Sequence, residues 1–165
     1  MWYVVVTLSV TFVAWLVWRW FAHRPLVFKP LVLPLDDPLM LATVEKARRT
    51  TDVLRSLFPD RPHDTYVKFP FASDGGTKEI LWGKLVEWAG EQMMIEFMNR
   101  PATHRGRFET RQIRPVAELE DWQVELADGR IRGAFSTLAM MTRVREQQGE
   151  LPAELAEQAT RFVDA

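Results

Sequence analysis

Few side chains in this chain have the chemistry that catalysis or metal binding requires. Glu79 and Asp121 are acids that could form a general acid–base pair, but their positions in the sequence do not show that they meet. The histidines, His23, His63 and His104, are isolated, and none has a second histidine at metal-binding spacing. The chain contains no cysteine, which excludes thiolate chemistry. We therefore expect no metal and no cofactor, and an enzyme that uses Glu79 and Asp121 is kept as an alternative.

The strongest binding feature is a run of arginines opposed only by Glu109. Its members are Arg100, Arg105, Arg107, Arg111 and Arg114. If residues 108–113 form a strand, side chains at alternate positions share one face and leave a positive patch at a sheet edge. Such a patch could bind an acidic protein partner or anionic lipid, or simply discourage the edge from pairing with other strands. Nucleic acid is not expected, because aromatic residues do not interleave with these arginines and the formal net charge is −1.

Short segments with alternating apolar and polar residues must position these side chains. The pattern predicts strands over 66–71, 80–88, 92–98, 108–113, 122–126 and 131–135, the last two joined around Asp128-Gly129. Helical spacing predicts a helix over 38–58 that begins at Asp37-Pro38, a helix capped by Ser136 or Thr137 and ended by Gly149, and a last helix over 151–162. The expected fold class is α+β, with a small curved antiparallel sheet or open barrel flanked by helices.

The N-terminal segment is apolar, and residues 1–18 contain no charged side chain. At about 1.5 Å per residue, a helix of this length covers roughly 27 Å, close to the hydrocarbon thickness of a bilayer. The span extends to residue 22 if Arg19 snorkels. Rings that favour membrane interfaces lie near both ends, at Trp2, Tyr3, Trp15, Trp18 and Trp20. We predict a transmembrane helix over 1–22, with a cleaved signal peptide and a buried core helix as weaker alternatives.

Positive charge follows this segment, at Arg19, Arg24 and Lys29. The positive-inside rule then places the N-terminus outside and the C-terminal part in the cytoplasm. The expected organisation is a transmembrane helix over 1–22, a proline-rich linker over 23–37, an α+β domain over 38–145 and an amphipathic helix over 146–165. The expected location is the bacterial inner membrane, crossed once, with the lipid bilayer as a partner.

Short motifs between residues 44 and 143 resemble a known family. They are Ala47-Arg48-Arg49-Thr50, Val67-Lys68, Asp74-Gly75-Gly76, Glu79 with Trp82, Asn99-Arg100-Pro101, Asp121-Trp122, and Asp128-Gly129 to Gly133. Their order and spacing resemble the bacterial YegJ-like domain of unknown function (domain of unknown function 2314). The resemblance implies an α+β fold and no established activity. Family members often carry a histidine after the glutamate that matches Glu79, whereas Ile80 stands here, which weakens the transfer of chemistry that depends on that histidine.

The motif residues are candidates for binding, and each also has a structural explanation. The candidates are Glu79, Trp82, Asn99, Arg100, Asp121 and Trp122. Asp121 is suited to hydrogen-bond neighbouring backbone while the Trp122 indole fills the core, and Asn99 is suited to satisfy backbone groups in a loop. The leading hypothesis is a non-enzymatic binding or accessory domain near the inner membrane. A toxin-neutralising immunity protein is a second hypothesis, which rests on size and architecture alone.

Overall fold

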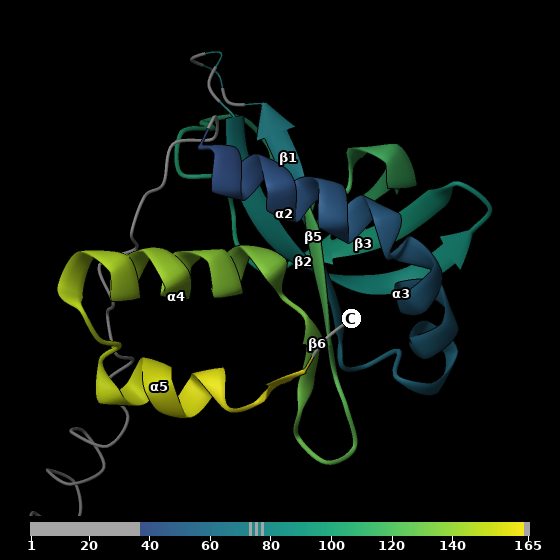
Figure 1. The fold of residues 1–165 in the computed structure, drawn as a ribbon. Coiled ribbons are helices and arrows are strands. Elements are labelled where there is room, and N and C mark those ends of the chain that lie inside the picture. Colours follow the sequence, from purple (N-terminus) through teal and green to yellow (C-terminus); the bar gives the residue numbers. More distant parts are fainter. Residues whose placement is uncertain (1–36, 73, 75, 77, 164–165) are drawn as a thin grey trace, which may run out of the picture. The chain divides into compact units, whose positions relative to one another are not determined.

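The computed structural model describes residues 37–72, 74, 76 and 78–163. This part of the chain forms a seven-stranded sheet with helices packed against it (Figure 1). The strands are β1 (Thr65–Ala72), β2 (Lys78–Ala89), β3 (Gln92–Phe97), β4 (Arg111–Pro115), β5 (Asp121–Glu125), β6 (Ile131–Gly133) and β7 (Phe162–Val163). Their order across the sheet is β4-β3-β2-β1-β5-β6-β7. Neighbouring strands are antiparallel except β6 and β7, which run parallel.

The helices of the described residues are α2 (Pro38–Arg49), α3 (Thr51–Leu57), α4 (Phe135–Gln148) and α5 (Ala153–Ala159), with single 3₁₀ turns at Phe58–Asp60 and Val116–Glu118. As predicted, α2 begins at Asp37, whose side chain accepts a hydrogen bond from the Leu39 amide at 2.8 Å. The single helix expected over 38–58 is instead divided at Thr50. The Thr50 hydroxyl donates to the Lys46 carbonyl at 2.8 Å, a side-chain bond of the kind that bends helices.

Buried side chains alternate along β1, β2 and β3 and form the core face of the sheet. Those with no exposed surface include Val67, Phe69, Leu85, Met93 and Ile95. The helices α2 and α3 add Ala47 and Leu54 to the same core. This alternation is what predicted the strands, because a strand with one buried face places every second side chain inside.

Three sequence predictions for the sheet were wrong in detail. The strand predicted over 131–135 ends at Gly133, because α4 begins at Phe135. The fourth strand begins at Arg111 rather than at Phe108, because the Phe108 ring turns inward and packs edge-on against Phe71 with 5.4 Å between ring centroids. Arg107 therefore does not share a strand face with Arg111. The segment expected to end the last helix instead forms β7, which pairs in parallel with β6.

The predicted fold class therefore needs correction. The α+β class holds, but the sheet is open and mixed rather than antiparallel or barrel-like. The predicted transmembrane helix over 1–22 and most of the predicted linker lie outside the described residues. So do the predicted interface residues Trp2, Tyr3, Trp15, Trp18, Arg19, Trp20 and Arg24.

Within the described part of the chain, no helix has the length and apolar character needed to cross a membrane. The longest helix there, α4, has 14 residues, which span roughly 21 Å at 1.5 Å per residue, short of the ~30 Å that a bilayer core requires. The predicted location, a single pass through the bacterial inner membrane with a cytoplasmic C-terminal domain, finds no support in this structure and is withdrawn.

Candidate functional site

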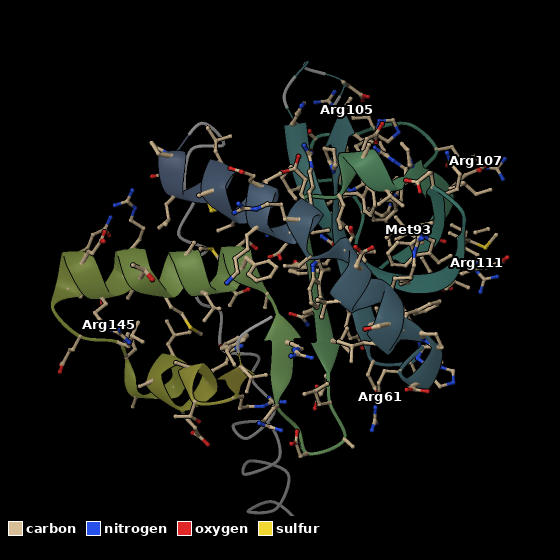
Figure 2. The ribbon with its side chains drawn as sticks, turned by 45° about the vertical axis from the view of Figure 1, so that its right-hand side comes forward. Arg61, Met93, Arg105, Arg107, Arg111 and Arg145 are labelled. Atoms are coloured by element: carbon tan, nitrogen blue, oxygen red, sulfur yellow. The ribbon has the colours of Figure 1, made fainter. Side chains whose placement is uncertain are left out.

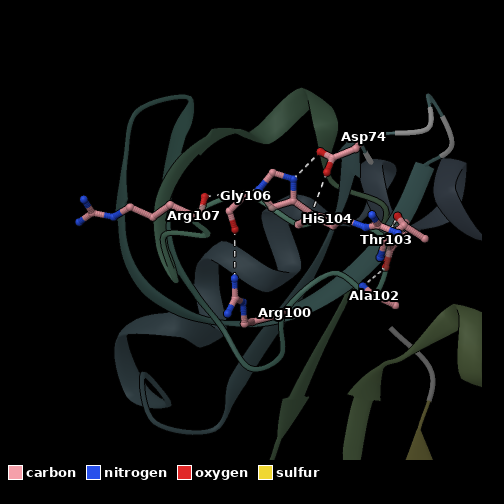
Figure 3. Close-up of polar contacts among 9 residues, drawn as sticks. Asp74, Arg100, Ala102, Thr103, His104, Gly106 and Arg107 are labelled. Carbon is pink, nitrogen blue, oxygen red and sulfur yellow. Dashed lines mark hydrogen bonds and ion pairs between the residues drawn. The ribbon is translucent and has the colours of Figure 1, made fainter.

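The segment between β3 and β4, residues 98–110, is an irregular loop that we call the arginine loop. Figure 3 shows Ala102 and Thr103 in its first half, and Glu79 on β2 holds both of them. The Glu79 carboxylate accepts hydrogen bonds from the amides of Ala102 at 2.6 Å and Thr103 at 2.8 Å, and from the Thr103 hydroxyl. The Thr103 donors keep the pKa of Glu79 below its ordinary value, because they stabilise the ionised carboxylate.

Asp74 holds the second half of the arginine loop. Its carboxylate contacts Nδ1 of His104 at 2.7 Å and accepts a hydrogen bond from the Arg105 amide at 2.9 Å. The other ring nitrogen of His104, Nε2, lies 3.4 Å from the Arg107 carbonyl oxygen. Both ring nitrogens therefore face an acceptor, an arrangement that the doubly protonated imidazolium satisfies. The hydrogen bond to Asp74 accordingly raises the pKa of His104.

Aromatic contacts seat the same loop on the core face of the sheet. The Phe108 ring packs against Phe71 and, with 5.8 Å between centroids, against Phe97. The His104 ring meets Phe71 edge-on with 5.3 Å between centroids. A Cβ atom at Gly106 would lie 2.9 Å from two atoms of the His104 ring, so a glycine is needed there for the ring to keep its place.

The arginines named from the sequence divide into paired and unpaired groups. Arg100 donates to the Gly106 carbonyl at 3.1 Å, and Arg111 pairs with Glu96 at 3.0 Å. The side chains of Arg105 and Arg107 are exposed, and within the described residues the structure gives neither guanidinium a hydrogen bond or ion pair. In Figure 2 both point outward, on the side of the molecule away from Arg145. Arg114 forms an ion pair with Glu118 and donates a hydrogen bond to the Pro70 carbonyl.

Asp121 is buried at the start of β5 and holds the beginning of α4. Its carboxylate accepts hydrogen bonds from the amides of Trp122 at 2.8 Å, Phe135 at 3.1 Å and Ser136 at 2.8 Å, and from the Ser136 hydroxyl. The sequence predicted the contact with neighbouring backbone but assigned the cap of this helix to Ser136 or Thr137. The residue at the cap position is Ala134, which has a left-handed φ of 55° and no side-chain acceptor, so the acceptor comes from β5. Burial raises the pKa of Asp121.

Lys68 on β1 completes this cluster. Its ammonium donates to the Ser136 hydroxyl at 3.0 Å and lies 5.1 Å from the centre of the Trp82 ring. Desolvation lowers the pKa of Lys68. A serine beside such a lysine is found in some hydrolases, but acyl transfer also needs free donors for an oxyanion.

The donors at the start of α4 are already used. The amides of Phe135 and Ser136 donate to Asp121, and those of Thr137 and Leu138 donate to the Ala134 carbonyl at 3.0 and 3.1 Å. Ser136 itself is 2% exposed. The cluster therefore joins a strand to a helix and does not offer a reactive hydroxyl to a substrate.

Glu79 and Asp121 do not form the acid–base pair that the sequence left open. Asp121 lies opposite Lys68 in the sheet, and Glu79 lies opposite Phe71. Because Lys68 and Phe71 are three positions apart on one strand, the two acids point to opposite faces of the sheet.

Three binding candidates from the sequence remain, Trp122, Trp82 and Asn99, and the structure shows where each side chain lies. Trp122 has no exposed surface, and its indole nitrogen donates to the Ala47 carbonyl at 3.2 Å and the Thr50 hydroxyl at 3.1 Å. Trp82 is half-buried beside Lys68, and Asn99 is exposed at the start of the arginine loop.

Sequence reasoning missed a cavity of about 240 Å³ between α2, β1, β2 and the start of α4, which we call the α2–β1 cavity. Lys68 and Ser136 line it together with residues of α2 and β2. Its signal in the sequence was weak, because the lining residues come from five separate segments. Among residues 37–72, 74, 76 and 78–163, no group of three or more His, Asp or Glu side chains is placed to hold a metal ion.

Comparisons of the chain with protein-family models, with curated proteins and with solved structures found no match. The resemblance to the YegJ-like domain therefore stays a prediction that rests on its short motifs. The structure gives several of those motifs a local explanation. Asp128, for example, accepts a hydrogen bond from the Arg130 amide at 3.0 Å in the β5–β6 turn, and a Cβ at Gly133 would lie 2.3 Å from the Trp122 carbonyl oxygen.

Proposed function

We propose that this chain is a non-catalytic binding domain that docks an acidic segment of a partner protein on the arginine loop. The observation that carries the proposal is the pair Arg105 and Arg107, whose exposed guanidinium groups have no partner within the described residues. Guanidinium groups bind carboxylates through two parallel hydrogen bonds, which favours an acidic partner.

The loop is organised before any partner arrives. An irregular segment normally loses conformational entropy when it binds, and this loss weakens the complex. Here Glu79 and Asp74 already fix the backbone from Ala102 to Arg105, and the half-buried Phe108 packs against the core. The loop has therefore lost this conformational entropy already on folding. Less of the free energy of the contacts made by Arg105 and Arg107 is then offset when a partner binds.

Within the described residues, no acid forms an ion pair with either of these two arginines. The oxygens of Glu79 and Asp74 accept from loop donors, and Glu96 is paired with Arg111. Met98, at the start of the loop, is 64% exposed and offers an apolar contact to the same partner. Exposed ion pairs contribute about 0.2–1 kcal/mol each, so we expect moderate affinity that falls with salt.

The test measures binding of a fluorescein-labelled peptide of eight glutamates to the full chain by fluorescence anisotropy at 50 and 300 mM NaCl. The double variant Arg105→Gln/Arg107→Gln should bind about two- to thirtyfold more weakly, the effect of losing two exposed ion pairs. The control is Arg49→Gln/Arg145→Gln, which removes the same charge from exposed arginines on α2 and α4.

Two results would overturn the proposal. An equal loss in both double variants would mean that the peptide senses net charge and not the loop. Binding to vesicles of phosphatidylserine and phosphatidylcholine that depends on Arg105 and Arg107, with no binding to the peptide, would assign the loop to lipid instead. A third variant, Glu79→Gln, keeps both arginines but loosens their loop, and it should weaken peptide binding as well.

A further inference from the structure

The α2–β1 cavity combines a half-buried cation, Lys68, with apolar walls. Lys68 and Ser136 line it from the sheet and the start of α4, while Met40 and Val44 on α2 and Ile80 on β2 supply apolar surface. Leu41 also lies on the lining and is 56% exposed.

Lys68 has donor capacity to spare at this cavity. An ammonium carries three hydrogens, and the Ser136 hydroxyl accepts one of them at 3.0 Å. The Trp82 ring lies on another side of the ammonium, 5.1 Å away. An acceptor that enters the cavity would therefore meet a partly desolvated cation, where a charge-assisted hydrogen bond is stronger than at the open surface.

The charges around the cavity favour a singly charged anion. Three cations, Lys68, Lys78 and Arg48, line it, and Glu120 is the acid on the lining. The buried Asp121 also faces Lys68, so three cations and two carboxylates leave one net positive charge. A dianion such as a phosphate monoester would exceed this charge and would be repelled by Glu120.

The size of the cavity sets the length of the ligand. At about 30 Å³ per water-sized group, 240 Å³ holds roughly eight non-hydrogen atoms. This is below the range of drug-sized sites, about 300–1,000 Å³. We propose that the α2–β1 cavity binds a short monocarboxylate, with its carboxylate on Lys68 and its apolar tail between Val44 and Ile80. The site is separate from the arginine loop and does not rest on the function proposed for that loop.

The experiment titrates the ¹⁵N-labelled full chain with hexanoate and follows the backbone amide signals by NMR. Hexanoate should shift the amides of Val44, Lys68 and Ile80, with a dissociation constant of about 1 mM or tighter. Hexanol lacks the charge and acetate lacks the tail, so each should bind at least about tenfold more weakly than hexanoate. Inorganic phosphate, which adds charge and has no tail, should not compete.

Two variants test the assignment of the ligand groups. Lys68→Met keeps the length of the side chain, removes the ammonium and should weaken hexanoate at least about tenfold. Its matched control is Lys84→Met on β2, which removes one positive charge from a lysine outside the cavity lining and should leave affinity unchanged. Ile80→Phe narrows the cavity without a change of charge and should also weaken binding, which keeps the test decisive if Lys68→Met fails to fold.

Three results would refute this assignment. One is hexanol binding as tightly as hexanoate, and another is unchanged hexanoate affinity in Lys68→Met or in Ile80→Phe. The third is a set of hexanoate shifts confined to residues 98–110, which would place the anion on the arginine loop.

Discussion

Replacement of Asp121 by alanine removes the acceptor that joins β5 to α4. Its carboxylate accepts from three backbone amides, those of Trp122, Phe135 and Ser136, and from the Ser136 hydroxyl. Asp121 has no exposed surface, so water cannot replace the lost acceptor without opening the junction. The same change leaves the Lys68 ammonium without its buried counter-charge.

The expected loss of stability follows from these contacts. A buried donor left without a partner costs about 1–3 kcal/mol, and Asp121→Ala leaves four donors without theirs. These costs overlap, because the same local opening relieves several of them, and we expect Asp121→Ala to lower the free energy of unfolding by about 3–5 kcal/mol. A domain of this size has about 5–15 kcal/mol in total, so the variant should lose between about a fifth and all of its stability.

Urea unfolding followed by far-UV circular dichroism measures this loss. Asp128→Ala is the matched control, because Asp128 also accepts from a backbone amide and pairs with an arginine, but on the exposed β5–β6 turn. The control should lose much less than Asp121→Ala. A loss below about 1 kcal/mol for Asp121→Ala, the size of an ordinary substitution, would refute the view that this carboxylate holds the junction.

Three further changes test other parts of the structure. Gly133→Ala should lower the free energy of unfolding by about 2 kcal/mol or more in urea melts, because Gly133 has a φ of 85° and its new Cβ would meet the Trp122 carbonyl oxygen at 2.3 Å. Asp74 raises the pKa of His104 above its ordinary value of 6.5. The contribution of the His104–Asp74 contact to the free energy of unfolding is therefore complete below pH 6.5 and is lost as the pH rises through the pKa of His104 in the folded chain. Urea melts from pH 6 to 9 should show this decline in the wild type and not in His104→Gln. Glu79→Ala should speed amide hydrogen exchange at residues 102 and 103, while the exchange of β1 and β2 amides stays unchanged.

Local patterns predicted those elements whose partners lie nearby in sequence. Asp37 followed by Pro38 begins α2 as expected, since the capping carboxylate reaches an amide only two residues ahead. Gly149 ends α4 with a φ of 83°, a conformation that glycine adopts easily. Alternation predicted β1, β2 and β3 because each buries one face against the same core.

Predictions failed where a distant residue supplies the decisive contact. The cap of α4 comes from Asp121 on another strand, so the nearby Ser136 and Thr137 were misleading. Phe108 alternates like a strand residue, yet contacts with Phe71 and Phe97 draw it into the core, and β4 begins later. The α2–β1 cavity is formed only when five segments meet, and no single stretch of sequence contains its pattern.

The chemistry of the two prominent acids follows from the alternation of β1 and its neighbours. Glu79 faces the arginine loop and Asp121 faces α4, and the oxygens of each already accept from main-chain amides. An acid in this position cannot act as a base without releasing the segment that it holds. The donors that remain available for binding are cations instead. The Lys68 ammonium lies on one side of β1 and has hydrogens beyond the one that it donates to Ser136. The guanidinium groups of Arg105 and Arg107 lie on the loop over the other side. Variants at Arg105 and Arg107 should therefore change binding while the domain stays folded, whereas variants at Glu79 or Asp121 should act through the structure.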